Sequence, residues 1–531
     1  MSDYDTILKN GQIYDGSGSD PYIGDIAISG DKIVKVGKVD GSGDTEIDVG
    51  GFSVAPGFIN MLSWSVVSLI EDGRALGTIK QGVTLEVMGE GMSMGPLNER
   101  LKHELSEIFS TKYDITWNTL GEYLQFLENK GISTNVASFV GATTVRIYVL
   151  GHEDREPNDE ELEKMKSLVD QAMREGALGV GSALIYPPAF YASTNELIEL
   201  CKVASKYGGM FISHMRSEGT NFLEALDEFI TIVREAKVRG EIYHLKAAGE
   251  KNWSKMDSAI ANIQNARSEG LEITADMYLY TAGGTGLSST LPPWAQEGGQ
   301  EKFLARLKDP DTRAKLKIEM LESTKKWENF YTDAGPQNML ISSVGKDELK
   351  PLIGKRISEI AESRNQDPRD TIIDLLIQDE TRIETVYFLM SEENVKKKIA
   401  LPFMSFCSDA ASMSAKGVFL ENNEHPRAYG NFARLLGKYV RDEKVIPMKE
   451  AIRRLTSFPA DNLGLKDRGL LKKDLVADIV VFNPEKIEDK ATFDNPHQLA
   501  EGMIHVWVNG VQVLNNGTHT GNYPGQFVKR Q

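Results

Sequence analysis

Apolar and polar residues alternate with a period of two through residues 5–55, and turn sequences interrupt the alternation. The turns are Asp15-Gly16-Ser17-Gly18, Ser29-Gly30-Asp31 and Asp40-Gly41-Ser42-Gly43. This pattern predicts a series of short antiparallel strands. The last part of the chain repeats it, with strands expected at 477–482 and 504–513. Because a few strands alone bury little apolar surface, we expect the two ends to form one small β-domain in preference to two separate sheets.

The long middle of the chain has a different pattern, in which short apolar runs alternate with amphipathic helical stretches. One such helix is expected to begin after Asn158, which can cap it together with Glu161 three residues later. This alternation is typical of βα units around a parallel sheet. The predicted strands end near Ile59, Met88, Val140, Ala183, Ser213, Tyr243, Met277 and Cys407. Eight such units predict an α/β fold of the (β/α)8 barrel type.

The stretch from about 282 to 402 is too long for a loop of a compact domain. It predicts an insertion before the last barrel strand. We therefore expect three parts: residues 1–56 as the first half of the β-domain, 57–465 as the barrel, and 466–531 as the second half. The inserted subdomain is expected at about 282–345.

The composition limits the classes of binding partner and the cellular compartment that we expect for this protein. The chain has 531 residues, 41% of them hydrophobic, and a formal net charge of -17, which disfavours nucleic acids and anionic membranes as partners. Only two cysteines occur, Cys201 and Cys407, as expected in a reducing compartment. The amino terminus does not have the pattern of a signal peptide, and no apolar run is long enough to span a bilayer. These features predict a soluble cytoplasmic protein.

Two of the eight histidines, His214 and His244, each end an apolar run that reads as a buried strand. His214 is followed by Arg216 and Glu218 in the next loop. In parallel barrels the carboxyl ends of the strands carry the chemistry. The pair therefore predicts a metal or catalytic centre at the barrel mouth. The alternative is two capped histidines that only pack a strand end.

Further polar residues follow other predicted strands. Glu90 lies between two glycines after the second strand, Lys246 follows the sixth, Tyr278 and Tyr280 follow the seventh, and Asp409 ends the eighth. A carboxylate with two imidazoles suits zinc, and three protein ligands with an open position are the catalytic pattern. Asp409 would then serve as general base. Alternatively, Glu90 pairs with Lys246 or caps a helix, and Asp409 caps the segment after it.

Several sequence motifs extend almost from end to end and point to one family. They are Val54-Ala55-Pro56-Gly57-Phe58-Ile59-Asn60, Ser213-His214-Met215-Arg216-Ser217-Glu218-Gly219, His244-Leu245-Lys246-Ala247-Ala248-Gly249, Leu291-Pro292-Pro293-Trp294, Ser408-Asp409 and His425-Pro426-Arg427. In these motifs the chain resembles the N-acyl-D-amino-acid deacylases, or D-aminoacylases, of the amidohydrolase superfamily. The resemblance implies a β-sandwich formed from both chain ends and a barrel with an insertion.

The resemblance also implies roles for the strand-end residues. His214 and His244 fall on the two histidines that hold the tightly bound zinc of the family, and Asp409 falls on its catalytic aspartate. Glu90 falls where many members have a bridging cysteine, and a carboxylate there is a harder ligand that still binds zinc.

The groups that grip the substrate carboxylate in the family are also implied. Lys246 and a tyrosine of the pair Tyr278 and Tyr280 resemble them, and Arg427 is a further candidate anion ligand. The family usually has proline between the two tyrosines, where this chain has Leu279.

The largest departure from the family lies after the first predicted strand. The superfamily carries a His-x-His motif there, whereas this chain has Leu62 and Trp64 at the two histidine positions. Neither side chain coordinates a metal in the usual way. We therefore expect one metal ion per chain instead of two, and we expect Trp64 to line an acyl pocket of the substrate site.

These observations predict zinc-dependent hydrolysis of the amide bond of N-acyl amino acids, of the D configuration, by a metal-activated water. Such an enzyme is an amidohydrolase that acts on carbon–nitrogen bonds other than peptide bonds. The alternatives are a dipeptidase, a cyclic-amide hydrolase or another amidase for a more apolar amide, and a catalytically inactive barrel that binds a small molecule or a partner. Assembly into a homo-oligomer is compatible with the sequence.

Overall fold

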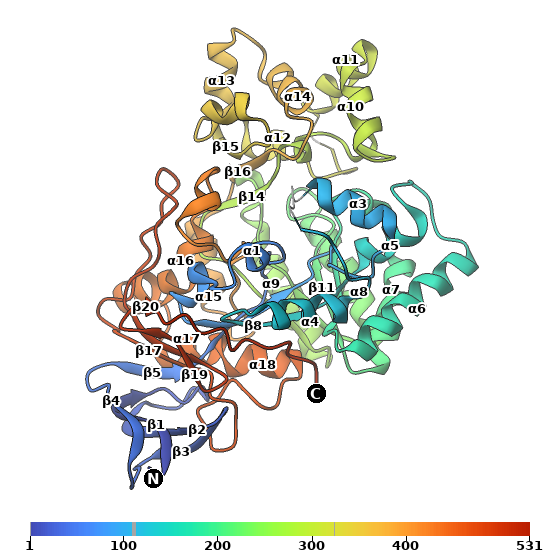
Figure 1. Cartoon of the computed structure of the whole chain (residues 1–531). Coiled ribbons are helices and arrows are strands. Elements are labelled where there is room, and N and C mark those ends of the chain that lie inside the picture. Colours follow the sequence, from blue (N-terminus) through green and yellow to red (C-terminus); the bar gives the residue numbers. More distant parts are fainter. Residues whose placement is uncertain (1, 109–112, 323) are drawn as a thin grey trace.

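The computed structural model describes residues 2–108, 113–322 and 324–531. Three regions follow one another in space: a sheet built from strands of both ends of the chain, a central barrel, and an inserted subdomain beyond the barrel (Figure 1). The described residues contain no helix that is both long and apolar enough to cross a membrane.

Strands from the two ends of the chain form one sheet. Strand β5 (Ser53–Pro56) pairs antiparallel with β17 (Ile479–Phe482), so that Val54 lies opposite Val481. Buried residues from both ends, among them Ile26 and Trp507, share one apolar cluster. This confirms the prediction of a single β-domain from both ends. The other strands are β1 (Tyr4–Ile13), β2 (Tyr22–Ser29), β3 (Lys32–Gly37), β4 (Gly43–Asp48), β18 (Met503–Val508), β19 (Val511–Asn515) and β20 (Thr518–His519).

The barrel strands pair in parallel and in chain order, in two runs. The first run is β6 (Phe58–Asn60), β7 (Val83–Met88) and β8 (Asn135–Ser138), and the second is β9 (Val140–Gly141), β10 (Gly179–Ala183), β11 (Met210–His214), β12 (Arg239–Ile242) and β13 (Ile273–Ala275). An extended segment at 404–410 lies between β13 and β6, because Met404 bridges Ala275 and Ala410 bridges Ser63 in parallel. This segment closes the barrel, and the predicted fold class is confirmed.

Helices cover the outside of the barrel, and their amphipathic pattern explains their packing. In α6 (Asp159–Glu175) the buried residues Met165, Leu168 and Val169 fall on one face, and Asn158 and Glu161 form the predicted capping box. The other helices outside the insertion are α1 (Ser68–Glu71), α2 (Leu76–Ile79), α3 (Glu99–Ile108), α4 (Leu120–Lys130), α5 (Ala142–Leu150), α7 (Thr194–Lys206), α8 (Phe222–Ala236), α9 (Lys255–Ser268), α15 (Glu392–Ile399), α16 (Arg427–Arg434), α17 (Met448–Leu455) and α18 (Ser457–Leu463).

The insertion has a sheet of its own. Strand β16 (Glu384–Phe388) pairs antiparallel with both β14 (Ala282–Gly286) and β15 (Met339–Ser343). The helices of the insertion are α10 (Gln300–Lys308), α11 (Pro310–Glu319), α12 (Phe330–Ala334), α13 (Ile357–Ser363) and α14 (Pro368–Asp379). The inserted structure therefore extends to Phe388, well beyond the boundary at about 345 that the sequence suggested.

Candidate metal centre

Three predicted ligands meet at the carboxyl ends of neighbouring barrel strands. His214 is the last residue of β11, His244 follows β12 by two residues, and Glu90 follows β7 by two. Glu90 lies between Gly89 and Gly91, both of which have positive φ angles of 107° and 67°. A side chain at either position would collide with the backbone or side chains of neighbouring strands, so this turn requires glycine on both sides of the carboxylate.

The donor atoms of these residues converge. Glu90 Oε1 lies 3.1 Å from His214 Nδ1 and 2.9 Å from His244 Nε2. One donor atom from each residue lies within 4.8 Å of the other two, and all three side chains are buried. The structure thus brings together all three residues that the sequence predicted as metal ligands.

The electrostatics of the cluster favour a cation. Burial opposes ionisation of Glu90, but hydrogen bonds and charges from His214 and His244 outweigh it, so the pKa of the carboxyl lies well below its usual value. Burial lowers the pKa of His214. One carboxylate oxygen and two imidazole nitrogens, convergent and shielded from water, fit a divalent ion such as zinc.

Glu218, to which the sequence analysis assigned no role, contacts both histidines. Its Oε1 lies 3.0 Å from His244 Nδ1, and its Oε2 lies 3.4 Å from His214 Nε2. These are the ring nitrogens that face away from Glu90. A carboxylate behind a metal-binding histidine fixes the tautomer and orientation of the ring. The only sequence signal is the position of Glu218 four residues after His214.

His244 is also fixed through its backbone. It has a φ of 33°, which is uncommon for a residue other than glycine. Its N–H donates to Oδ1 of buried Asp276 at 2.6 Å. Burial and the positive charge of Lys246 lower the pKa of His244. The negative charges of Glu218 and Asp409 outweigh them, so the net pKa is raised to about 10. No role was assigned to Asp276 from the sequence, although a carboxylate directly after the apolar strand β13 is a recognisable signal.

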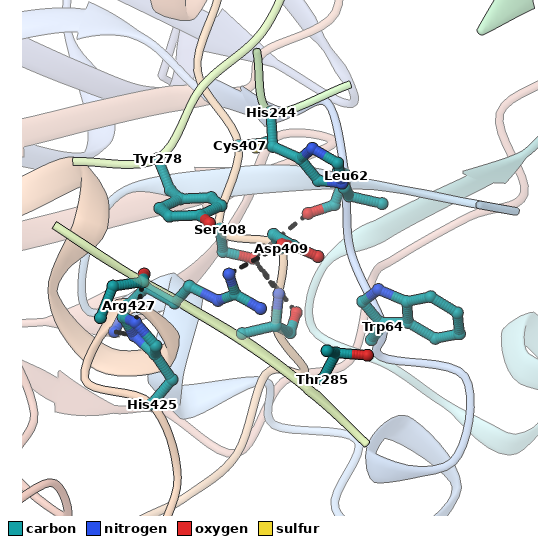
Figure 2. A network of polar contacts seen from close by, with 12 residues as sticks. Leu62, Trp64, His244, Tyr278, Thr285, Cys407, Ser408, Asp409, His425 and Arg427 are labelled. Atoms are coloured by element: carbon teal, nitrogen blue, oxygen red, sulfur yellow. Dashed lines mark hydrogen bonds and ion pairs between the residues drawn. The ribbon is translucent and has the colours of Figure 1, made fainter. Parts of the chain in front are cut away.

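Asp409 lies at the same mouth and pairs with Arg427. Arg427 Nη1 lies 2.7 Å from Asp409 Oδ2 (Figure 2). The N–H of Asp409 donates to the Leu62 carbonyl at 3.0 Å, and Asp409 has a φ of 48°. Burial raises the pKa of its carboxyl, whereas the charge of Arg427 lowers it, and the net shift is upward. Backbone strain of this kind is frequent at functional sites.

Arg427 and Tyr278 form one wall of the site. The guanidinium carbon of Arg427 lies 4.5 Å from the centre of the Tyr278 ring, a cation–π contact. Tyr280 does not share this position, because its hydroxyl donates to Asp489 at 3.2 Å. Lys246 lies near Tyr278, but its ammonium contacts Glu218 Oε1 at 2.6 Å. The roles of these residues in substrate binding stay predictions.

Trp64 makes a contact that the sequence did not predict. Its indole Nε1 donates to Glu90 Oε2 at 3.0 Å. Figure 2 shows Trp64 and Leu62 beside Asp409 at the barrel mouth. The two residues that replace the His-x-His motif therefore lie at the candidate metal centre.

Comparisons with known proteins identify the family of this chain. Residues 422–514 match the amidohydrolase family. A D-aminoacylase from Alcaligenes xylosoxydans xylosoxydans is 30% identical over 529 residues, which cover 99% of this chain and 98% of that protein. The chain belongs to the N-acyl-D-amino-acid deacylases of the amidohydrolase superfamily. It is thus an amidohydrolase that acts on carbon–nitrogen bonds other than peptide bonds, which favours the enzyme interpretation over the inactive barrel.

Two solved structures of deacylases extend the comparison. One is a D-aminoacylase with a binuclear metal centre, for which one-metal activation and second-metal attenuation are described. Its TM-score is 0.82 and its sequence identity is 30%, with 99% of this chain and 100% of that chain covered. An N-acyl-D-glutamate deacylase from Bordetella bronchiseptica, complexed with zinc and a phosphonate inhibitor, has a TM-score of 0.81 and 24% identity, with 99% of each chain covered. Metal binding is thus a property of this deacylase's structural relatives.

Proposed function

We propose that the protein is a zinc-dependent N-acyl-D-amino-acid deacylase with one metal ion per chain. The observation that carries the proposal is the buried convergence of Glu90, His214 and His244 at the barrel mouth, with their donor atoms within 4.8 Å of one another. Two of the similar proteins are a D-aminoacylase and an N-acyl-D-glutamate deacylase by name, and the second is complexed with zinc.

In this proposal Glu90, His214 and His244 hold the ion, and Glu218 orients both histidines from behind. A bound zinc ion would polarise the amide carbonyl and acidify the attacking water. Asp409 accepts a proton from that water and returns it to the leaving nitrogen. The water oxygen bonds to the carbonyl carbon, the carbon–nitrogen bond breaks, and the products are a carboxylate and a free amino acid.

Arg427 is the best-placed group for the substrate carboxylate. Its buried Nε makes no hydrogen bond with any group that the structure describes, and its Nη1 pairs with Asp409 Oδ2. A planar guanidinium with unused donors binds a carboxylate well. When the substrate occupies Arg427, the contact between Arg427 and Asp409 weakens, and Asp409 becomes available for proton transfer. Tyr278 supports the guanidinium by stacking, and Lys246 adds positive charge nearby.

A single ion is proposed because neither Leu62 nor Trp64 offers a metal-binding nitrogen or oxygen in the usual way. One-metal activation is described for a D-aminoacylase of similar structure. Activity with one ion is therefore chemically reasonable for this chain.

The test is a substrate panel with matched variants. From a panel of N-acyl-D-amino acids with apolar and acidic side chains, the wild-type protein is expected to hydrolyse D forms faster than the matching L forms and faster than dipeptides. His244→Ala should lose zinc and more than about a hundredfold of kcat/KM, since even the groups behind a ligand contribute that much. His152→Ala is the control, because His152 pairs with Glu104 outside the donor set. Full activity in His244→Ala, or a preference for L substrates, would contradict the proposal.

A further inference from the structure

The two carboxylate oxygens of Glu90 have different partners. Oε1 faces His214 Nδ1 and His244 Nε2, whereas Oε2 accepts a hydrogen bond from the indole N–H of Trp64 at 3.0 Å. Glu90 is 4% exposed. The carboxylate is therefore held at both ends, and one oxygen alone is directed at the histidine pair.

The backbone that carries Trp64 is anchored on both sides. The N–H of Trp64 donates to the Ala410 carbonyl at 3.1 Å, and the N–H of Ser63 donates to the Val87 carbonyl at 2.8 Å. Ser63 and Ala410 also form a parallel bridge. Because β7 carries Val87 and leads to Glu90, the indole and the carboxylate are attached to the same rigid part of the barrel. The hydrogen bond between them is therefore set by the barrel and not by a mobile loop.

The indole N–H has two consequences for Glu90. A buried carboxylate oxygen without a partner is unfavourable, so Trp64 stabilises the ionised form in a site closed to water. The hydrogen bond also restricts rotation of the carboxylate, which would otherwise turn Oε2 toward the histidines. Ligands bind a metal more tightly when their neighbours fix them in the binding orientation.

We propose that Trp64 is a positioning residue of the metal centre, whose indole N–H holds Glu90 Oε2 so that Glu90 presents Oε1 alone to the ion. This inference rests on the proposed function, because it requires that Glu90 bind a metal. It gives Trp64 a role in addition to the predicted lining of an acyl pocket. A packing role alone would not depend on the N–H or on Glu90.

The test compares zinc affinities of full-length variants by competition with a chromogenic chelator. Trp64→Phe keeps an aromatic ring and removes the N–H, and the expected result is a zinc Kd that rises about tenfold to a hundredfold. Trp294→Phe is the matched control, because Trp294 Nε1 also donates to a glutamate, Glu319, at 2.8 Å within the insertion. Its zinc Kd should equal that of the wild type. Circular dichroism confirms that both variants are folded.

A second background separates positioning from packing. In Glu90→Ala, the additional Trp64→Phe change should leave the zinc Kd unaltered, because no carboxylate remains to be positioned. Unchanged affinity in Trp64→Phe alone, or an equal loss in the Glu90→Ala background, would overturn the inference while leaving the proposed function intact. Absence of zinc binding by the wild-type protein would overturn both.

Discussion

Glu218 belongs to the candidate metal centre although it is not one of the three proposed ligands. It contacts the outward ring nitrogens of both His214 and His244, and it also pairs with Lys246. Burial opposes its ionisation, but Lys246 and the two histidines hold the pKa of its carboxyl well below the usual value. One buried carboxylate therefore faces, in each histidine, the ring nitrogen that points away from Glu90.

Replacement of this carboxylate by an amide is the prediction at the residue scale. Glu218→Gln keeps the shape of the side chain but removes the negative charge that faces Lys246 and the outward ring nitrogens of His214 and His244. We expect about a tenfold to hundredfold loss of zinc affinity and a lower kcat/KM that excess zinc partly restores. The measurement is turnover as a function of free zinc. A variant with wild-type zinc dependence would show that the histidines keep their orientation without Glu218.

At the residue scale, the sequence predicted where the site residues lie better than it predicted which side chains they contact. Residues at strand ends, such as Glu90 and His214, could be located because the direction of a parallel strand fixes where its carboxyl end lies. The contact of Trp64 with Glu90 depends on side-chain rotamers at two separate strand ends. No spacing along the chain encodes it, and the same holds for the pairing of Arg427 with Asp409.

Helix α6 illustrates what the sequence determines at the scale of one element. Its start was predicted from Asn158 and Glu161, and both hydrogen bonds of the capping box are present. Hydrogen bonds from Arg155 and from the N–H of Asn158 lower the pKa of Glu161 to about 2. Arg155 contacts both carboxylate oxygens of Glu161.

The shift of Glu161 makes a pH-dependent prediction. A carboxyl with a lowered pKa in the folded state stabilises the fold above its unfolded pKa, near 4.5, and loses this contribution as the pH falls toward 2. Glu161→Gln should therefore lower the thermal midpoint at about pH 5 and differ less from the wild type at about pH 3. Glu160→Gln, at an exposed position of the same helix, is the control. A difference that stays constant with pH would contradict this assignment.

The strands of the insertion could not be predicted from the sequence pattern. Strand β14 has the sequence Ala-Gly-Gly-Thr-Gly and so lacks the alternation that predicts a strand. It forms because β16 pairs with every one of its residues. The pattern of this segment therefore contains no local information about its structure, and the insertion was recognised by length alone.

At the scale of the whole molecule, the fold class was predictable because local patterns agreed with each other. Both chain ends show the same period of two, and the pairing of β5 with β17 joins them. The middle shows repeated βα units, and the predicted strand ends fall within two residues of the observed ones where the structure has a strand. Consistency between local and global patterns is what makes such a prediction possible.

The closing segment of the barrel is the exception. The predicted eighth strand forms two isolated bridges in place of a continuous ladder. Asp409 lies within this segment, between its two bridges, and its positive φ interrupts the extended backbone. The irregularity lies where Asp409 and the residues after it approach Leu62 and Trp64, so the departure from regular structure coincides with the candidate site.

The central claim is that one buried ion, held by Glu90, His214 and His244, supports hydrolysis. The most direct measurement is stepwise addition of zinc to metal-free protein, with turnover of the best N-acyl-D-amino acid of the substrate panel recorded at each step. The account predicts that activity rises linearly and reaches its maximum at one zinc ion per chain. Full activity without metal, or a maximum that requires two ions per chain, would contradict it.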